Sequence, residues 1–265
     1  AYSQHTSKVM DRDKRSQLHI DFTNRWAHAL KTPVSVIDLV LQQSRDAESM
    51  EEMRSLFESI QEENERITHG LNMMLGMARQ ERFSLDLFPE QVNLEKLVRE
   101  VINKHKKEFI RYSIYPRMEV LAGSTCVETD QKWMAFVIDQ LVANAIKYTR
   151  VAHLDGDKKL LIRIEEEAKA QGNANIPTDG NTIKLSVEDC GVGIPKQDLQ
   201  RIFEPFFTGE NGRLAPESTG MGLFLANRTC RELGHGLTVR SEPGQGTAIT
   251  VVFSTGAITS GLIVK

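Results

Sequence analysis

The sequence predicts two domains, an all-α helical hairpin that dimerises into a four-helix bundle, followed by an α/β domain. The first observation is a heptad-like spacing of apolar residues over 53–78. The second is Pro89, after which helical periodicity gives way to mixed helix and strand patterns. The third is size, since 265 residues with 40% hydrophobic content can build two folded cores.

Composition argues against several classes of protein. The formal net charge of -3, from 33 basic and 36 acidic residues, leaves no polybasic stripe for nucleic acid. No apolar run approaches the ~20 residues that span a bilayer, and the N-terminus is not a signal peptide. Three widely spaced cysteines without a CxxC pair predict neither disulfides nor zinc, which fits a reducing cytoplasm. Because the chain enters a charged helical pattern directly at Ala1, we expect a fragment of a longer protein.

A long first helix is expected over about 9–43, with a kink at Pro33. His28 falls opposite its apolar stripe, so the imidazole should face water, where a neutral ring nitrogen can accept a phosphoryl group. Lys31 and Thr32, at i+3 and i+4, share its face. Taken alone, such a histidine would more often be an ordinary surface residue. The stripe consists of Phe22, Trp26, Leu30, Pro33, Ile37 and Leu41.

A second helix follows the polar break at 44–49 and carries a heptad seam whose one polar position, Asn64, can fix the register. Two helices with so narrow a seam do not bury their apolar faces alone, so a dimeric four-helix bundle completes them. The alternative is a hairpin packed on the rest of the chain. Gly70 and Gly76 weaken the helix prediction slightly. The seam consists of Met53, Phe57, Ile60, Asn64, Ile67, Leu71, Met74 and Ala78.

The elements expected after Pro89 alternate in type. A polar stretch at 166–181, rich in Gly, Asn and Ala, predicts an extended mobile hairpin loop. Helices are expected over 94–109 and 131–149, and strands over 91–92, 118–121, 126–129, 160–165, 182–188, 237–241 and 247–253.

Two stretches look like parts of a nucleotide site. The helix over 131–149 places Gln140, Asn144 and Lys147 on one face, where carboxamide oxygens can ligate magnesium and an ammonium can meet phosphate. The run Asp189-Cys190-Gly191-Val192-Gly193-Ile194 follows a strand, so its glycines can admit a flat ring and its carboxylate can accept a hydrogen bond from an exocyclic amine. Alone, the first is more often an ordinary amphipathic helix and the second a simple turn.

Two further stretches complete the set. The aromatic run 202–207, which includes Phe203, precedes a polar loop at 208–219 that we interpret as a lid. The run Gly220-Met221-Gly222-Leu223 then opens a helix, whose free N–H groups suit phosphate. Lastly, Gly244-Gln245-Gly246-Thr247 turns tightly into a strand and offers a hydroxyl. Each stretch is weak by itself, but their order and spacing are specific.

In that order, the chain resembles the catalytic core of bacterial sensor histidine kinases over about residues 15–255. His28 lies in the H box, and the four later stretches match the N, G1, F plus G2, and G3 boxes. The resemblance implies a dimeric phosphoacceptor domain followed by an α/β sandwich that binds ATP as gyrase, chaperone and mismatch-repair ATPases do. The implied division is a linker or signal-transmitting helix at 1–17, a dimerisation and histidine phosphotransfer domain at 18–85, a catalytic ATP-binding domain at 86–256 and a tail at 257–265.

The resemblance also implies a role for each matching residue. His28, Lys31 and Thr32 would be catalytic, and Asn144 and Gln140 would hold Mg²⁺. The residues that bind ATP would be Asn144 and Lys147 at the phosphates, Tyr148 along the pocket, Asp189 at the adenine amine, Gly191 and Gly193 in the base turn, Gly220 and Gly222 at the phosphates, Thr247 at the adenine edge, and Ile194, Phe203 and Leu223 beside them.

One departure from the family concerns the residue after His28. Most such kinases carry Glu or Asp there as a presumed general base, whereas Ala29 cannot accept a proton. General-base help is typically ~10²- to 10⁴-fold, so its loss could slow the reaction. Gln140 also stands where many members have Asn. The run Trp26-Ala27-His28-Ala29-Leu30-Lys31-Thr32-Pro33 is similar to a subgroup of membrane kinases that work beside peptide-antibiotic transporters.

The leading hypothesis is a kinase core that phosphorylates His28 from MgATP and passes the phosphoryl group to an aspartate of a response regulator. Thr32 resembles the family's residue that orients water to dephosphorylate that regulator, so a phosphatase activity is also expected. The alternative is an ATP-binding signalling module with little autokinase activity, because Ala29 replaces the usual acid. An ATPase of the gyrase or chaperone kind leaves the histidine helix unexplained. We expect a homodimer, a membrane transporter or sensor as a further partner, and a cytoplasmic portion of a protein anchored in the bacterial inner membrane.

Overall fold

The computed structural model describes residues 2–45, 49–80, 83–152, 157–167, 182–215 and 218–254. The side chains at 2–19, 21–22, 79–80 and 84–85 lie outside this description. The chain divides into two units, Ala1–Met77 and Ala78–Lys265, and each is described by itself. The predicted tail at 257–265 lies outside the described residues.

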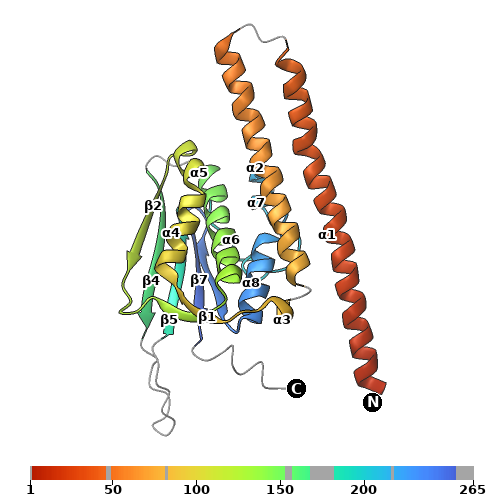
Figure 1. Cartoon of the computed structure of the whole chain (residues 1–265), viewed down its shortest axis with the longest axis vertical. Coiled ribbons are helices and arrows are strands. Elements are labelled where there is room, and N and C mark those ends of the chain that lie inside the picture. The colour runs from red at the N-terminus through yellow and green to blue at the C-terminus, as the bar shows by residue number, and fades with distance from the viewer. Residues whose placement is uncertain are drawn as a thin grey trace. The chain divides into compact units, whose positions relative to one another are not determined.

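The first unit is a hairpin of two long helices, α1 (Tyr2–Gln43) and α2, which runs over Met50–Gln80 (Figure 1). The indole Nε1–H of Trp26 donates a hydrogen bond to the carbonyl of Gly70 at 3.0 Å. A Cβ at Gly70 would lie 3.0 Å from Leu30 Cδ2, so the absence of a side chain lets the helices approach closely there. The glycine that weakens the helix prediction thus has a packing function.

The apolar stripe of α1 differs from the prediction at its end. Pro33 is buried, and the helix continues through it to Gln43. Val40 is only 6% exposed, whereas Leu41 is 50% exposed, so Leu41 was wrongly placed in the stripe. The reason is the spacing of residues along a narrow helix seam, which alternates between four and three. The steps from 26 to 30, 33 and 37 are four, three and four residues, so the next seam position is 40 and not 41.

Part of the predicted α2 seam is exposed within a single chain. Phe57 is 63% and Leu71 44% exposed, and Leu39 and Leu75 are also largely open to solvent. Large apolar side chains gathered on a helical hairpin in this way are typical of a surface that another chain covers.

The second unit is a five-stranded sheet covered by helices on one face (Figure 1). The strand order is β2-β4-β5-β7-β6; β2 pairs with β4 in parallel, and the other pairs are antiparallel. The strands are β2 (Ile114–Val120), β4 (Lys158–Glu167), β5 (Thr182–Asp189), β6 (Gly236–Glu242) and β7 (Gly246–Phe253), and a separate ribbon pairs β1 (Glu90–Asn93) with β3 (Cys126–Thr129). The helices are α3 (Phe83–Asp86), α4 (Leu94–Lys104), α5 (Lys106–Arg111), α6 (Gln131–Arg150), α7 (Asn211–Leu214) and α8 (Gly222–Glu232).

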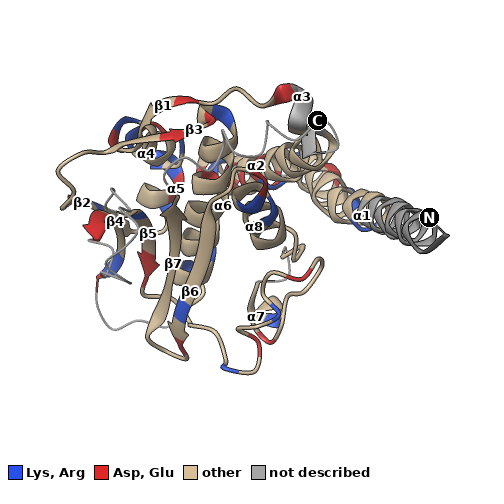
Figure 2. Ribbon diagram, turned by 90° about the horizontal axis from the view of Figure 1, so that it is seen from below, with Lys and Arg blue, Asp and Glu red and all other residues tan. Residues whose placement is uncertain are grey.

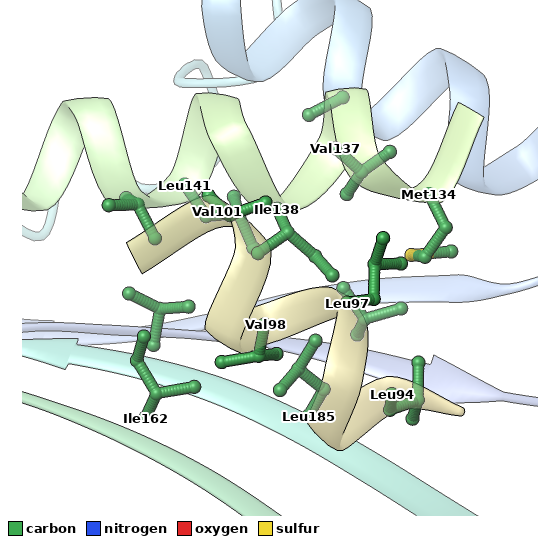
Figure 3. Packing of buried hydrophobic residues seen from close by; sticks show 14 of the residues in the cluster. Leu94, Leu97, Val98, Val101, Met134, Val137, Ile138, Leu141, Ile162 and Leu185 are labelled. Carbon is green, nitrogen blue, oxygen red and sulfur yellow. The ribbon is translucent and has the colours of Figure 1, made fainter. Parts of the chain in front are cut away.

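The core lies between the sheet and helices α4 and α6. Alternate residues of β4 are fully buried, as the two-residue period of a strand requires when one face is covered. Helix α4 directs Val98 toward Ile162 and Leu185 of the sheet (Figure 3). Helix α6 packs along α4 and contributes Met134, Val137, Ile138 and Leu141 to the same cluster. Two side chains start these helices by accepting backbone N–H bonds, Asn93 from Lys96 and Asp130 from Trp133.

Several predicted elements need correction. The expected helix over 94–109 is two helices, because His105 leaves helical geometry (φ -89, ψ 8). β2 begins at Ile114, four residues early, and β4 extends to Glu167, so the loop predicted at 166–181 begins later; residues 168–181 lie outside the described ones. The predicted lid contains a short helix, α7.

Charge is distributed without large blocks of one sign. Lys and Arg residues are interspersed with Asp and Glu on the described helices and strands (Figure 2). Among the described residues, no helix is both long and apolar enough to cross a membrane.

Candidate functional site

The histidine face of α1 is open to solvent. Trp26 and Leu30 lie toward Gly70 of α2, which fixes the rotation of α1 and turns His28 away from the hairpin interface. His28 is exposed, as predicted, and so are Ala29, Lys31 and Thr32. An incoming group can therefore reach the imidazole without rearrangement of the hairpin.

Asp189 ends β5 opposite Thr247 of β7. Its Oδ1 accepts hydrogen bonds from the N–H groups of Gly191, at 2.8 Å, and Thr247, at 3.2 Å. Burial raises the pKa of the carboxyl to about 7, and the two N–H bonds oppose that rise. Within the described residues only Oδ1 has partners, so Oδ2 is available to an outside donor such as an exocyclic amine.

The turns around Asp189 depend on glycine. Gly193 has φ +69, and a Cβ there would collide with the carbonyl of Glu242. Gly246 has φ +94, and a Cβ there would collide with the carbonyl of Asp189 itself. Both backbones adopt the left-handed region that favours glycine, and both pass close to a neighbouring main chain. The turns beside Asp189 are therefore held by closely packed backbone.

Ser241 is a residue of this region that the sequence did not reveal. Its Oγ accepts the N–H of Ile194 at 2.8 Å and donates to the carbonyl of Gly246 at 2.7 Å. It also lies 2.9 Å from Thr247 Oγ1. Ser241 thus joins the turn after β5 to the hairpin of β6 and β7. A serine inside an ordinary strand pattern gives no sequence signal of such a role.

The carboxamides of α6 lie beside the N-terminus of α8. Gln140 is 1% exposed, and within the described part of the chain its Nε2 has no hydrogen-bond partner. A Cβ at Gly222 would lie 2.8 Å from Gln140 Oε1 and 3.6 Å from Asn144 Nδ2. Among the residues that the structure describes, no side chain caps the start of α8 at Met221, so the first N–H groups of this helix can meet a ligand.

This corner fits a magnesium-bound phosphate. The atom of Gln140 that lacks a partner among the residues described is Nε2, a donor that does not bind a cation but can donate to a phosphate oxygen, and a buried donor without a partner is costly. Mg²⁺ bound with a nucleotide takes one or two oxygen donors from the protein and the rest from phosphate and water. Gln140 and Asn144 offer such oxygens, while no group of three His, Cys, Asp or Glu side chains that could hold a metal ion by itself is found among the described residues.

Four more of the predicted residues lie on α6, on α8 and before the predicted lid. Lys147 Nζ lies 4.6 Å from the ring centre of Tyr148, whose hydroxyl is 3.5 Å from Ser218 Oγ. Leu223 packs against the hydrophobic core, and Phe203 is half-buried before the predicted lid.

The predicted lid is closed at its base and tied to the turn after Asp189. Gly220 has φ +69, and its carbonyl accepts the N–H of Phe206 at 3.0 Å, which joins the two ends of the segment. Phe206 itself has φ +65, which is unusual for a bulky residue. Within the segment, Asn211 Nδ2 donates to the carbonyl of Gly193 at 2.7 Å. Neither Phe206 nor Asn211 was predicted, since both roles depend on backbone placed by other segments.

Comparison with known proteins identifies both units. Residues 19–83 match the His Kinase A (phospho-acceptor) domain, and residues 129–256 match the Histidine kinase-, DNA gyrase B-, and HSP90-like ATPase family. The sensor histidine kinase YxdK of Bacillus subtilis is 36% identical over 94% of this chain and 69% of its own length. The sensor protein kinase GraS of Staphylococcus aureus is 29% identical over 94% and 64%, and the sensor protein BceS of Halalkalibacterium halodurans is 31% identical over 86% and 60%.

Solved structures share the fold. Histidine kinase AdeS of Acinetobacter baumannii superposes with a TM-score of 0.57 at 22% identity, covering 86% of this chain and 98% of that one. Histidine kinase ThkA, solved with response regulator protein TrrA, gives a TM-score of 0.60 at 20% identity, covering 93% and 65%. This chain spans about two thirds of the length of its curated relatives.

Proposed function

This chain belongs to the sensor histidine kinases of bacterial two-component systems, and from that premise we propose that His28 accepts the γ-phosphoryl group of ATP bound at Asp189. The family consists of ATP-dependent protein-histidine kinases, which pass the phosphoryl group on to a response regulator. One observation carries the assignment of residues: the same chain holds an exposed histidine in its phosphoacceptor unit and a partly buried carboxylate framed by glycine turns in its ATPase unit.

The ATPase unit binds and orients the donor. Asp189 accepts the adenine amine, and Thr247 borders the base. The N–H groups at the start of α8 and the Lys147 ammonium hold the phosphates, and Gln140 and Asn144 hold Mg²⁺. Magnesium, when bound, neutralises phosphate charge. As in other phosphoryl transfers, these residues act chiefly by positioning and by electrostatic stabilisation.

His28 supplies the nucleophile. A neutral ring nitrogen forms a bond to the γ-phosphorus while the bond to the β–γ bridging oxygen breaks, and ADP leaves with that electron pair. The other ring nitrogen then loses its proton. Because the face of α1 around His28 is exposed, water can take this proton where Ala29 offers no carboxylate. The comparisons give no support to the alternative of a module with little autokinase activity.

The response regulator is the next acceptor. An aspartate oxygen of the regulator takes the phosphoryl group from His28, whose imidazole leaves neutral after gaining a proton. Support for this partner comes from histidine kinase ThkA, which has been solved with its response regulator. The same proposal has Thr32 orient water for dephosphorylation of this regulator, and its exposed position one turn after His28 supports that role.

A homodimer is the assembly we propose. The match to the phosphoacceptor domain and the exposed apolar side chains of the hairpin support it. Anchoring of the full-length protein at the bacterial inner membrane is part of the same proposal, supported by similarity to sensor kinases longer than this chain. A membrane transporter as a further partner stays a prediction from the run around His28.

The test uses ATP labelled at the γ-phosphate, with Mg²⁺. The unsubstituted chain should acquire label that is lost in acid and kept in alkali, as a phosphohistidine requires. His28→Gln should acquire none while its affinity for ATP is unchanged, because the two units build their sites separately. Label that persists in His28→Gln would reject this histidine as the acceptor.

A further inference from the structure

Four charged side chains join helices α4, α5 and α6. His105 is 6% exposed, with Nε2 2.9 Å from Asp139 Oδ1 and Nδ1 2.8 Å from Glu108 Oε1. Lys104 Nζ lies 2.6 Å from the same Asp139 oxygen. Because both ring nitrogens face carboxylate oxygens, both carry protons, and the imidazole is a cation. The cluster therefore balances two cations with two anions.

The surroundings of His105 support this charge state. Burial lowers the pKa of the imidazole, but the hydrogen bonds to Asp139 and Glu108 outweigh burial and raise the pKa to about 9. Desolvating such charges is costly, and apolar side chains of similar volume often stabilise a fold as well or better. Stability alone is thus a weak explanation for an ionic cluster at this helix contact.

Asp139 is the neighbour of Gln140 in α6. Successive residues of a helix point about 100° apart, and α6 lies between α4 and α8 (Figure 1). Asp139 consequently reaches His105 at the end of α4, while Gln140 reaches Gly222 at the start of α8. A single turn of α6 therefore connects the ionic cluster to the carboxamide of Gln140, beside the start of α8.

Apolar packing and hydrogen bonds both act on the orientation of α6. Ile138 and Leu141 pack against α4 near Val101 (Figure 3), and the hydrophobic effect that drives this contact is non-directional. Hydrogen bonds are directional, and each weakens steeply when its angle changes. The bonds of Asp139 to His105 and Lys104 therefore add a directional constraint on the rotation and axial position of this turn.

We propose that His105 and Asp139 are positioning residues for the metal-bound nucleotide, holding α6 so that the carboxamides of Gln140 and Asn144 meet the metal and its phosphates. The inference rests on the proposed function in taking MgATP as the ligand. His105 acts through α6 and touches neither nucleotide nor metal. The adenine end of the pocket is built by β5, β7 and their turns, so recognition of the base is independent of the cluster.

The test compares two ligands on the whole chain. One is a non-hydrolysable ATP analogue with Mg²⁺, and the other is adenosine in EDTA; each displaces a fluorescent nucleotide. His105→Leu should weaken binding of the Mg²⁺-bound analogue about tenfold, with less than about a twofold change for adenosine. The Mg²⁺ concentration at half-saturation should rise in parallel with the loss of analogue affinity.

Two variants keep the test decisive. Asp139→Asn preserves the side-chain volume and an oxygen acceptor for His105, so it provides a folded variant if His105→Leu does not fold. It should weaken binding of the Mg²⁺-bound analogue, by less than His105→Leu does, and leave binding of adenosine unchanged. Arg99→Met removes an exposed ion pair with Glu95 on α4 and should change neither affinity.

Two outcomes would overturn the proposal. A parallel loss for both ligands would assign the cluster a structural role only, and unchanged affinities in folded variants would remove the link to α6. Failure of the proposed function would be distinguishable, because it would show as an unsubstituted chain that does not label His28.

Discussion

The two units place their functional groups in opposite ways. In the hairpin, His28 stands on an exposed helix face, whose direction is set by contacts elsewhere on α1, such as those of Trp26 and Leu30 with Gly70. In the ATPase unit, Asp189 is enclosed by turns whose backbones touch one another. The hairpin should thus tolerate most substitutions that spare the reacting group, whereas the ATPase unit should fail at positions that carry no chemistry at all.

The largest effect is expected at a glycine. Gly193→Ala should abolish ATP binding, because the new Cβ would collide with the Glu242 carbonyl and force the adenine turn apart. Gly244 provides the matched control, since its φ is also positive, at +77, but a Cβ there meets nothing within 4 Å. Gly244→Ala should cost only about 1–2 kcal/mol of backbone strain. Nucleotide titration and thermal unfolding measure both, and equal losses would contradict the role of close approach.

Asp189→Asn should lower ATP affinity about 10- to 100-fold, the range for loss of a hydrogen bond to a charged group. The asparagine oxygen can still accept the N–H groups of Gly191 and Thr247, so the turn should persist. Circular dichroism and titration with ATP would measure the two effects. Full affinity in this variant would refute the adenine assignment.

The raised pKa of Asp189 predicts opposite pH trends for binding and stability. With a pKa of about 7, the carboxylate needed for the adenine amine forms as pH rises from 6 to 8, so affinity for adenosine should increase. Between the unfolded value, near 4, and 7, the folded protein binds more protons than the unfolded chain, so this group's contribution to the free energy of unfolding falls as pH rises. Both trends should vanish in Asp189→Asn; an adenosine affinity that stays constant with pH in the unsubstituted chain would exclude this titration.

The smallest effects are expected in the hairpin. Trp26→Phe removes the hydrogen bond to Gly70 and should destabilise the hairpin by about 1 kcal/mol, without changing ATP affinity. In Gly70→Ala, the gain of up to about 1 kcal/mol in helix propensity opposes crowding of the flexible Leu30 side chain, so we expect a change near zero. Thermal unfolding measures the change in stability of both variants. A large loss of nucleotide affinity in either variant would contradict the claim that the two units build their sites independently.

Sequence patterns captured the fold because each unit follows a simple periodicity, and they indicated the chemistry because carboxamide, carboxylate and glycine recur in a fixed order. They failed where a role depends on distant backbone. Ser241 joins two turns only because the register of β6 and β7 brings Thr247 beside it. His105, where α4 ends, is held by Asp139, 34 residues later in the chain. Periodicity within one segment contains neither partner.

The bond between Trp26 and Gly70 ties the direction of the His28 imidazole to the packing of the two helices. A turn of α1 by one residue, about 100°, would break that bond, carry the imidazole of His28 through the same angle and take Pro33 and Val40 out of their buried positions. The direction in which His28 presents its ring is therefore as stable as the helix interface itself. A signal that redirects the ring has to repack that interface.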